Sequence, residues 1–137
     1  MPTKQCTPET FGQAMQSLLN EYSVEVVKAS NEAVVQTARK DVRDLKGASR
    51  IFKSNRRGHK YARSWTFRKT KDELGSATCV VYNREYQLTH LLEKGHKIVR
   101  NGETIGHYEG HAHIKDVADR TGKALEDFFK SGMSRIR

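Results

Sequence analysis

The chain has 137 residues, of which 36% are hydrophobic and 30% charged, and its formal net charge is +9. That size suits a single domain, residues 1–137, with a modest hydrophobic core. No run approaches the ~20 apolar residues of a membrane span, and residues 1–6 lack a signal-peptide core, so we expect no membrane contact and no export by that route. Cys6 and Cys79 have no metal-type spacing, which fits a reducing, cytosolic origin.

A long helix is predicted over residues 7–46. Thr7 can cap it, Pro8 suits its first position, and Glu9 complements its positive end. Apolar residues then recur at steps of three or four as far as Leu45, which predicts one stripe on a helix about 50 Å long. A domain this small cannot cover such a stripe. We therefore expect either a break near residues 20–23 or a second subunit that covers the exposed part.

The positive charge is concentrated in one segment. Residues 39–71 contain thirteen Lys or Arg and two Asp, whereas the remainder contains twelve Lys or Arg and fourteen Asp or Glu. Such a field favours an anionic partner, nucleic acid or an acidic protein surface. Within it, residues 47–60 have few apolar side chains and predict a mobile basic loop. The candidate contacts to DNA or to a partner protein are Arg50, Lys53, Arg56, Arg57 and Lys60. The alternative is a solvated loop that only aids solubility.

The rest of the chain predicts a small sheet and two helices. Residues 61–70 alternate as a half-buried strand, residues 77–82 are apolar on both faces as in a central strand, and Asn101-Gly102 predicts a hairpin of residues 97–100 and 103–108. A short helix ends at Gly95, and a last helix starts near Ile114. The fold class is α+β: a long N-terminal helix, a small, mainly antiparallel sheet of three to four strands with a short helix inserted, and a C-terminal helix packed on the sheet.

One shared core is expected for the apolar side chains of these elements. Close packing is also expected at Gly122, since a glycine inside a helix costs about 1 kcal/mol of helix propensity. The predicted core residues are Trp65, Phe67, Val81, Leu88, Leu91, Leu92, Ile114, Val117, Leu125 and Phe128.

The histidines do not form a convincing catalytic or metal site. His111 and His113 could chelate an ion if extended, but no Cys pair or His-Glu-x-x-His helix supports them, so we expect no metal and no cofactor. The predicted role of this pair is to hydrogen-bond backbone N–H groups at a strand-to-helix junction, or another chain. His90 with Glu93 is a conceivable acid/base pair, although surface positions on a short helix explain it better. No nucleophile elbow or phosphate-binding loop is present, so we expect no enzyme.

Two other functions stay open from the residues alone. The order helix, strands, helix is also that of a double-stranded-RNA-binding domain, so a small basic nucleic-acid-binding module is the main alternative. Such modules carry a Lys-rich cluster at the start of the second helix. Here that helix starts Ile114-Lys115-Asp116, so the cluster is absent. A small basic nuclease using His90, His107 or His111 is a more distant alternative.

Several motifs together resemble a known family. They are Gly58 and Tyr61 before Trp65, then Tyr82-Asn83, then the run from Tyr86 to Gly95 with its Leu-Thr-His-Leu-Leu-Glu-Lys-Gly sequence, and finally Gly-His-Ala-His-Ile around His113. The chain is similar to the tail-completion, or head–tail joining, proteins of long-tailed (siphovirus-type) double-stranded-DNA bacteriophages. The matching positions are Trp65, Tyr82, Tyr86, Leu88, His90, Leu91, Leu92, Glu93, Gly95 and His113.

The resemblance implies a structural virion protein without catalysis. Members of that family form a ring, commonly of six subunits, between the head-side connector or head-closure protein and the tail tube or tail terminator protein. Double-stranded DNA passes through the ring. The expected location is therefore the neck of the virion, with assembly in the host cytoplasm.

Overall fold

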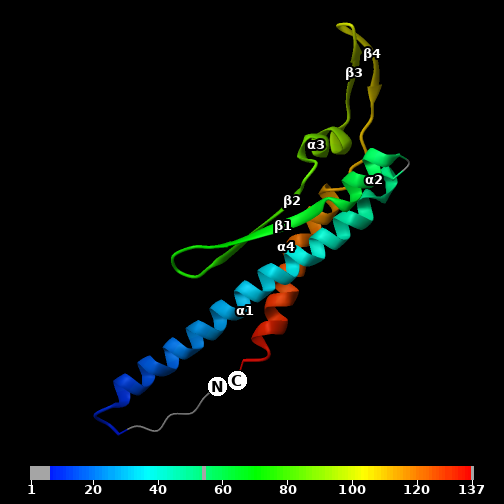
Figure 1. Cartoon of the computed structure of the whole chain (residues 1–137). Helices are drawn as coiled ribbons and strands as arrows, with labels where there is room; N and C mark the ends of the chain where they lie inside the picture. The colour runs from blue at the N-terminus through cyan, green and yellow to red at the C-terminus, as the bar shows by residue number, and fades with distance from the viewer. Residues whose placement is uncertain (1–6, 54, 137) are drawn as a thin grey trace.

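The computed structural model describes residues 7–53 and 55–136. Figure 1 shows an elongated molecule in which a long helix and a shorter one lie side by side and two hairpins project from them. Among the described residues, none of the helices combines the length and the apolar character needed to cross a membrane. The elements in order are α1 (Phe11–Ala48), the 3-10 helix η1 (Ser49–Phe52), α2 (Arg56–Arg63), β1 (Trp65–Lys71), β2 (Ala77–Asn83), α3 (Tyr86–Lys94), β3 (His96–Arg100), β4 (Glu103–Tyr108) and α4 (Lys115–Met133).

The two long helices pack antiparallel. The Thr121 hydroxyl of α4 donates to Asp41 Oδ2 of α1 at 2.7 Å, and Gly132 near the end of α4 lies against Ala29. The break expected near residues 20–23 is absent, because α1 is a single helix of 38 residues. Residues 11–27 of α1 therefore extend beyond the end of α4 by about 26 Å (Figure 1). We call this segment the overhang.

The loop expected over residues 47–60 is instead mostly helical in the residues described there. They form the end of α1, η1 and the start of α2. Phe52 is buried despite its basic neighbours, and the Asn55 side chain caps α2 by accepting from Gly58 N–H at 2.8 Å. Burial of one aromatic side chain and a helix cap favour this helical structure in spite of the like charges, and the mobility of the segment stays a prediction.

The α+β class is confirmed, but the strands form two sheets rather than one. β1 pairs only with β2, and β3 only with β4, both antiparallel. β2, expected as a central strand, is half of a hairpin, and its Val80 is exposed. β1 begins at Trp65 rather than at residue 61, because α2 runs to Arg63. The predicted turn at Asn101-Gly102 is confirmed, since both residues have positive φ.

The core lies where all these elements converge. Its buried members are Leu45, Phe52, Tyr61, Trp65 and Val117, and Val42, Val81, Leu88, Leu92 and Ile114 pack against them. Through Val117 and Ile114 the start of α4 packs on Trp65 and Val81, at the base of the β1–β2 hairpin.

Some predicted core positions lie elsewhere. Phe67, Leu91 and Phe128 are half-buried outside this cluster, and Leu125 is exposed. The close packing expected at Gly122 is absent, because a Cβ there would meet nothing within 4 Å. The apolar periodicity of residues 114–129 therefore predicted a longer buried face on α4 than the structure has, because α1 and the core cover only part of that face.

We predict that Gly58→Ala strongly destabilises the protein. A Cβ at this position would stand 1.6 Å from the Phe52 carbonyl oxygen, so α2 and η1 must separate, at a cost of more than about 2 kcal/mol. Gly122→Ala is the matched control and should stabilise α4 by up to about 1 kcal/mol. Urea unfolding of both variants measures this. Equal stabilities would mean that α2 does not pack against Phe52 in solution.

Candidate functional site

The motif residues from Tyr86 to Gly95 include the residue that caps the start of α4. Glu93, near the end of α3, accepts from the backbone N–H groups of His113 at 2.6 Å, Ile114 at 2.9 Å and Lys115 at 3.1 Å. These are N–H groups that a helix start leaves without intrahelical partners. Ile114, at the N-cap position, makes no side-chain cap. A carboxylate from another helix therefore supplies the cap and meets the positive end of α4.

The His113 ring joins Glu93 to Tyr61. The ring is buried, 2% exposed, and its Nδ1 lies 2.9 Å from both Glu93 Oε1 and the His111 carbonyl oxygen. Because both neighbours are acceptors, Nδ1 carries the proton in the neutral ring, and Nε2 accepts from the Tyr61 hydroxyl at 2.7 Å. The expectation that the histidines bind backbone N–H groups at this junction is therefore corrected for His113: its ring bonds a carbonyl, a carboxylate and a hydroxyl, and Glu93 accepts from the N–H groups instead.

Aromatic packing and further hydrogen bonds surround the hydrogen-bonded chain of Glu93, His113 and Tyr61. The Phe52 ring packs edge-on against His113 with centroids 4.8 Å apart, and Trp65 Nε1 donates to Ser49 Oγ at 2.9 Å. Asn83 Nδ2 donates to the Tyr61 carbonyl at 2.9 Å. Elements η1, α2, β1, β2 and α3 and the start of α4 thus meet at one largely buried polar network, in which each named polar group has a partner.

Gly95 is needed for two reasons. Its φ of +85° ends α3 in a region that favours glycine. A Cβ there would also stand 2.2 Å from the Tyr108 carbonyl oxygen, and one on Gly110 would stand 2.4 Å from Gly95 N. The two glycines let the end of α3 and the segment entering α4 pass in close contact, which allows His111 N–H to donate to the Leu92 carbonyl at 2.8 Å.

The carboxylate–imidazole–phenol chain has the order of a catalytic relay but not its access. Tyr61 is 0% exposed, and burial raises the pKa of its hydroxyl to about 12. Burial alone would raise the pKa of Glu93, but the three backbone donors and His113 outweigh it and hold that pKa below its ordinary value. Tyr61 and His113 are almost completely buried, so the geometry favours a structural role for these groups. No group of three metal-ligating side chains is assembled among the residues described.

The other motif residues divide into packed and exposed ones. Trp65, Leu88 and Leu92 belong to the core or its edge. Tyr86 and His90 are exposed on α3, and Tyr82 is exposed beneath the Arg68 guanidinium, 5.9 Å from its ring centroid. The motif therefore explains how α3 docks, and its exposed members are available to a partner.

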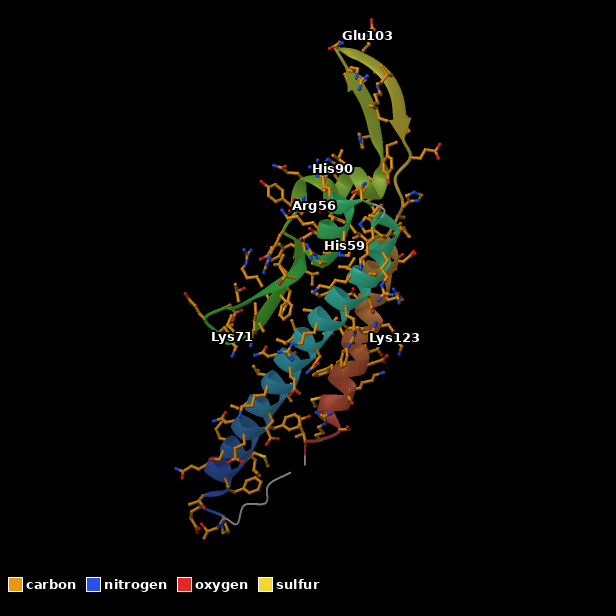
Figure 2. The ribbon with its side chains drawn as sticks, turned by 45° about the vertical axis from the view of Figure 1, so that its right-hand side comes forward. Arg56, His59, Lys71, His90, Glu103 and Lys123 are labelled. Carbon is orange, nitrogen blue, oxygen red and sulfur yellow. The ribbon has the colours of Figure 1, made fainter. Side chains whose placement is uncertain are left out.

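The five predicted contact cations do not form one surface. Arg50 and Lys53 face one groove, and Arg56 and Arg57 face another. Lys60 pairs with Glu85 at 2.9 Å. Figure 2 shows Arg56 and His59 on α2 in the middle of the molecule, with Lys71 and Glu103 at the separate tips of the two hairpins.

The first groove, the basic groove, has a volume of about 590 Å³ between α1, η1 and the end of α2. Sequence analysis did not single out four of its six cations, although a spacing of three or four residues along α1 was the available signal. Within the described part of the chain, none of the six makes an ion pair. They are Arg39, Arg43, Lys46, Arg50, Lys53 and Arg63.

The second groove, the aromatic groove, has a volume of about 670 Å³ between η1, α2, α3 and the base of the β3–β4 hairpin. Phe52, His111 and Tyr108 form a connected series of rings along it, with successive centroids 6.2 Å apart. Arg56 and Arg57 line it as well, and none of its lining residues is acidic.

Comparison of the chain with family models, with characterised proteins and with solved structures gives no match.

We predict that Glu93→Gln lowers the free energy of unfolding at pH 7 by about 1–2 kcal/mol, because one uncharged acceptor replaces a carboxylate shared by three N–H donors. The folded-state pKa of Glu93 is lowered. The difference from the parent protein should therefore be complete above the ordinary glutamate pKa of 4.5 and shrink as pH falls through the lowered value.

Urea unfolding between pH 7 and pH 2 measures this difference, with Glu103→Gln at the tip of the exposed β3–β4 hairpin as the control that should behave like the parent protein. A difference that does not change with pH would show that the carboxylate charge does not support α4.

Proposed function

We propose that this chain is a structural subunit of a phage neck, a tail-completion or head–tail joining protein. In this proposal copies of the chain form a ring, a hexamer by the family resemblance alone, between the head-side connector or head-closure protein and the tail tube or tail terminator. Double-stranded DNA passes through the ring, and no catalysis is involved. The observation that carries the proposal is the uncovered apolar overhang of α1.

The overhang presents a continuous apolar stripe to solvent. Phe11, Met15, Leu19 and Tyr22 recur at steps of three or four residues and are 56%, 42%, 54% and 38% exposed. Contiguous exposed apolar surface of this kind marks interaction sites in soluble proteins. A single subunit with this stripe in water is incomplete, which supports assembly.

The other end of the molecule is also uncovered. The β3–β4 hairpin projects away from the core (Figure 1) and exposes Ile98, Val99 and Ile105. Apolar surfaces at opposite ends of an elongated subunit favour head-to-tail contacts between copies, and such contacts close into a ring when the rotation between neighbours permits.

We predict that the parent protein is larger than a monomer in solution and that Phe11→Ser/Met15→Ser/Leu19→Ser is a monomer. The substituted side chains are exposed on the overhang, which contributes no residue to the core cluster, so secondary structure should be retained apart from some fraying of the overhang. Light scattering after size exclusion measures the masses. Leu74→Ser, at an exposed apolar residue of the β1–β2 tip, is the control and should assemble like the parent protein.

A monomeric parent protein at micromolar concentration, together with its absence from purified virions, would defeat the neck proposal.

A second candidate function, binding of nucleic acid as such, is favoured by the basic groove. Arg39, Arg43 and Lys46 lie on successive turns of α1, and Arg50, Lys53 and Arg63 continue the cluster. The groove offers no aromatic side chain, so bases have nothing to stack on, as single-strand binding would require. Its apolar side chains are limited to Val42 and Ala62, too few to anchor a protein partner. A groove with many cations and no aromatic or large apolar side chain suits the phosphate backbone of a duplex.

We predict that the parent protein binds duplex DNA of any sequence and that Arg43→Gln/Lys46→Gln/Arg50→Gln reduces the slope of log affinity against log salt by about 3. Fluorescence anisotropy with a 30-base-pair duplex between 50 and 200 mM salt measures this. The control, Lys115→Gln/Lys123→Gln/Lys130→Gln, removes the same charge from exposed ion pairs on α4.

If the two variants lose the same amount of salt dependence, the duplex is attracted by the net charge of the protein and not by the basic groove. Tighter binding of an oligo-glutamate peptide than of the duplex would assign the basic groove to an acidic protein.

A further inference from the structure

We infer that the aromatic groove of one copy is the seat for the overhang of a second copy. The inference rests on the proposal that the chain assembles with itself, and it adds which two surfaces meet. Both surfaces are uncovered in the single chain, and they match in apolar character, in charge and in position.

The aromatic groove has the composition of a helix-binding site. Ile51 is 58% exposed on its edge, and Leu88 and Leu92 of α3 line it. Its rings continue from Phe52 through His111 and Tyr108 to His96, whose centroid is 5.5 Å from that of Tyr108. A volume of about 670 Å³ accepts two or three large side chains rather than a whole helix, which corresponds to anchors spaced along one helix face.

The overhang supplies such anchors. Phe11, Met15 and Leu19 are at steps of four residues and lie on one face. A phenyl ring and a flexible thioether both pack well against aromatic side chains, the thioether sulfur especially at ring edges. The stripe and the groove therefore match in chemistry as well as in size.

The charges of the two surfaces are opposite. The overhang and the four residues before it, residues 7–27, contain three glutamates and no lysine or arginine, and Glu9, two residues before α1, is exposed. The aromatic groove is bordered by Arg56 and Arg57 and has no acidic lining residue. Two overhangs packed on each other would bring like charges together, whereas an overhang in the groove brings opposite charges together. In this arrangement the acidic residues of one copy lie near Arg56 and Arg57 of the next.

The positions of the two surfaces exclude contact within one chain. The overhang starts at one end of the molecule, and the aromatic groove lies near the other, beside the β3–β4 hairpin (Figure 1). Each copy therefore gives its overhang to one neighbour and receives an overhang from another, which is the heterologous contact that a closed ring requires.

Cysteine cross-linking tests the inference on the full chain. In a background of Cys6→Ser and Cys79→Ala, three variants are oxidised and compared on a denaturing gel: Met15→Cys alone, Ile51→Cys alone, and Met15→Cys/Ile51→Cys on one chain. We expect the single variants to stay monomeric on the gel, their equimolar mixture to give dimers, and the double variant to give a ladder that ends at the closed ring.

Dimers from Met15→Cys alone would show that overhangs pair with each other and would overturn the inference. So would a double variant that assembles by light scattering yet does not cross-link, because the groove would then be vacant or hold another molecule. A protein that does not assemble at all would defeat the ring proposal itself, and the measured mass separates that result from failure of the docking. Moving one cysteine, as Leu74→Cys paired with Ile51→Cys, gives a control that should not cross-link.

Discussion

The structure depends on one carboxylate that starts a helix in another part of the chain. Glu93 accepts three backbone N–H groups at the beginning of α4 and also meets His113 Nδ1. α4 has no cap of its own, so its first turn is stabilised only when α3 is in place. His113 is hydrogen-bonded in turn to Tyr61, which is a member of the buried core. The position of α3, the start of α4 and the packing of the core therefore depend on one another through these contacts.

These contacts explain what the residues from Tyr86 to Gly95 do in this fold. Leu88 and Leu92 pack α3 against the core, Glu93 caps α4, and Gly95 permits the close passage of Gly110. Each of these residues therefore has a structural role, and the basic groove and the overhang lie outside this packed part of the motif.

Concentrating the core at one junction leaves the extremities bare. The buried cluster joins the end of α1 to α2, β1 and α4, so the overhang and the β3–β4 hairpin extend from it without support. In a monomer this would expose apolar side chains with no compensating gain. In an assembly the same extensions provide the contact area, and a small subunit can reach its neighbours at both ends.

The sequence by itself determined the type of most elements and the α+β class. The long helix follows from a stripe at steps of three and four, the β3–β4 turn from Asn101-Gly102, and the end of α3 from Gly95. These are local effects of backbone geometry, which neighbouring residues decide.

Only the tertiary structure decided the rest. Residues 49–52 and 56–63 of the basic segment form η1 and α2. Phe52 is buried there, and no local sequence pattern predicts that burial. The tertiary structure divided the strands into two hairpins, and it separated the basic residues into two grooves with different chemistry. It also placed Glu93, expected at the surface of a short helix, as the half-buried cap of α4. These outcomes join residues that are tens of positions apart, and such contacts leave no periodic signal in a single sequence.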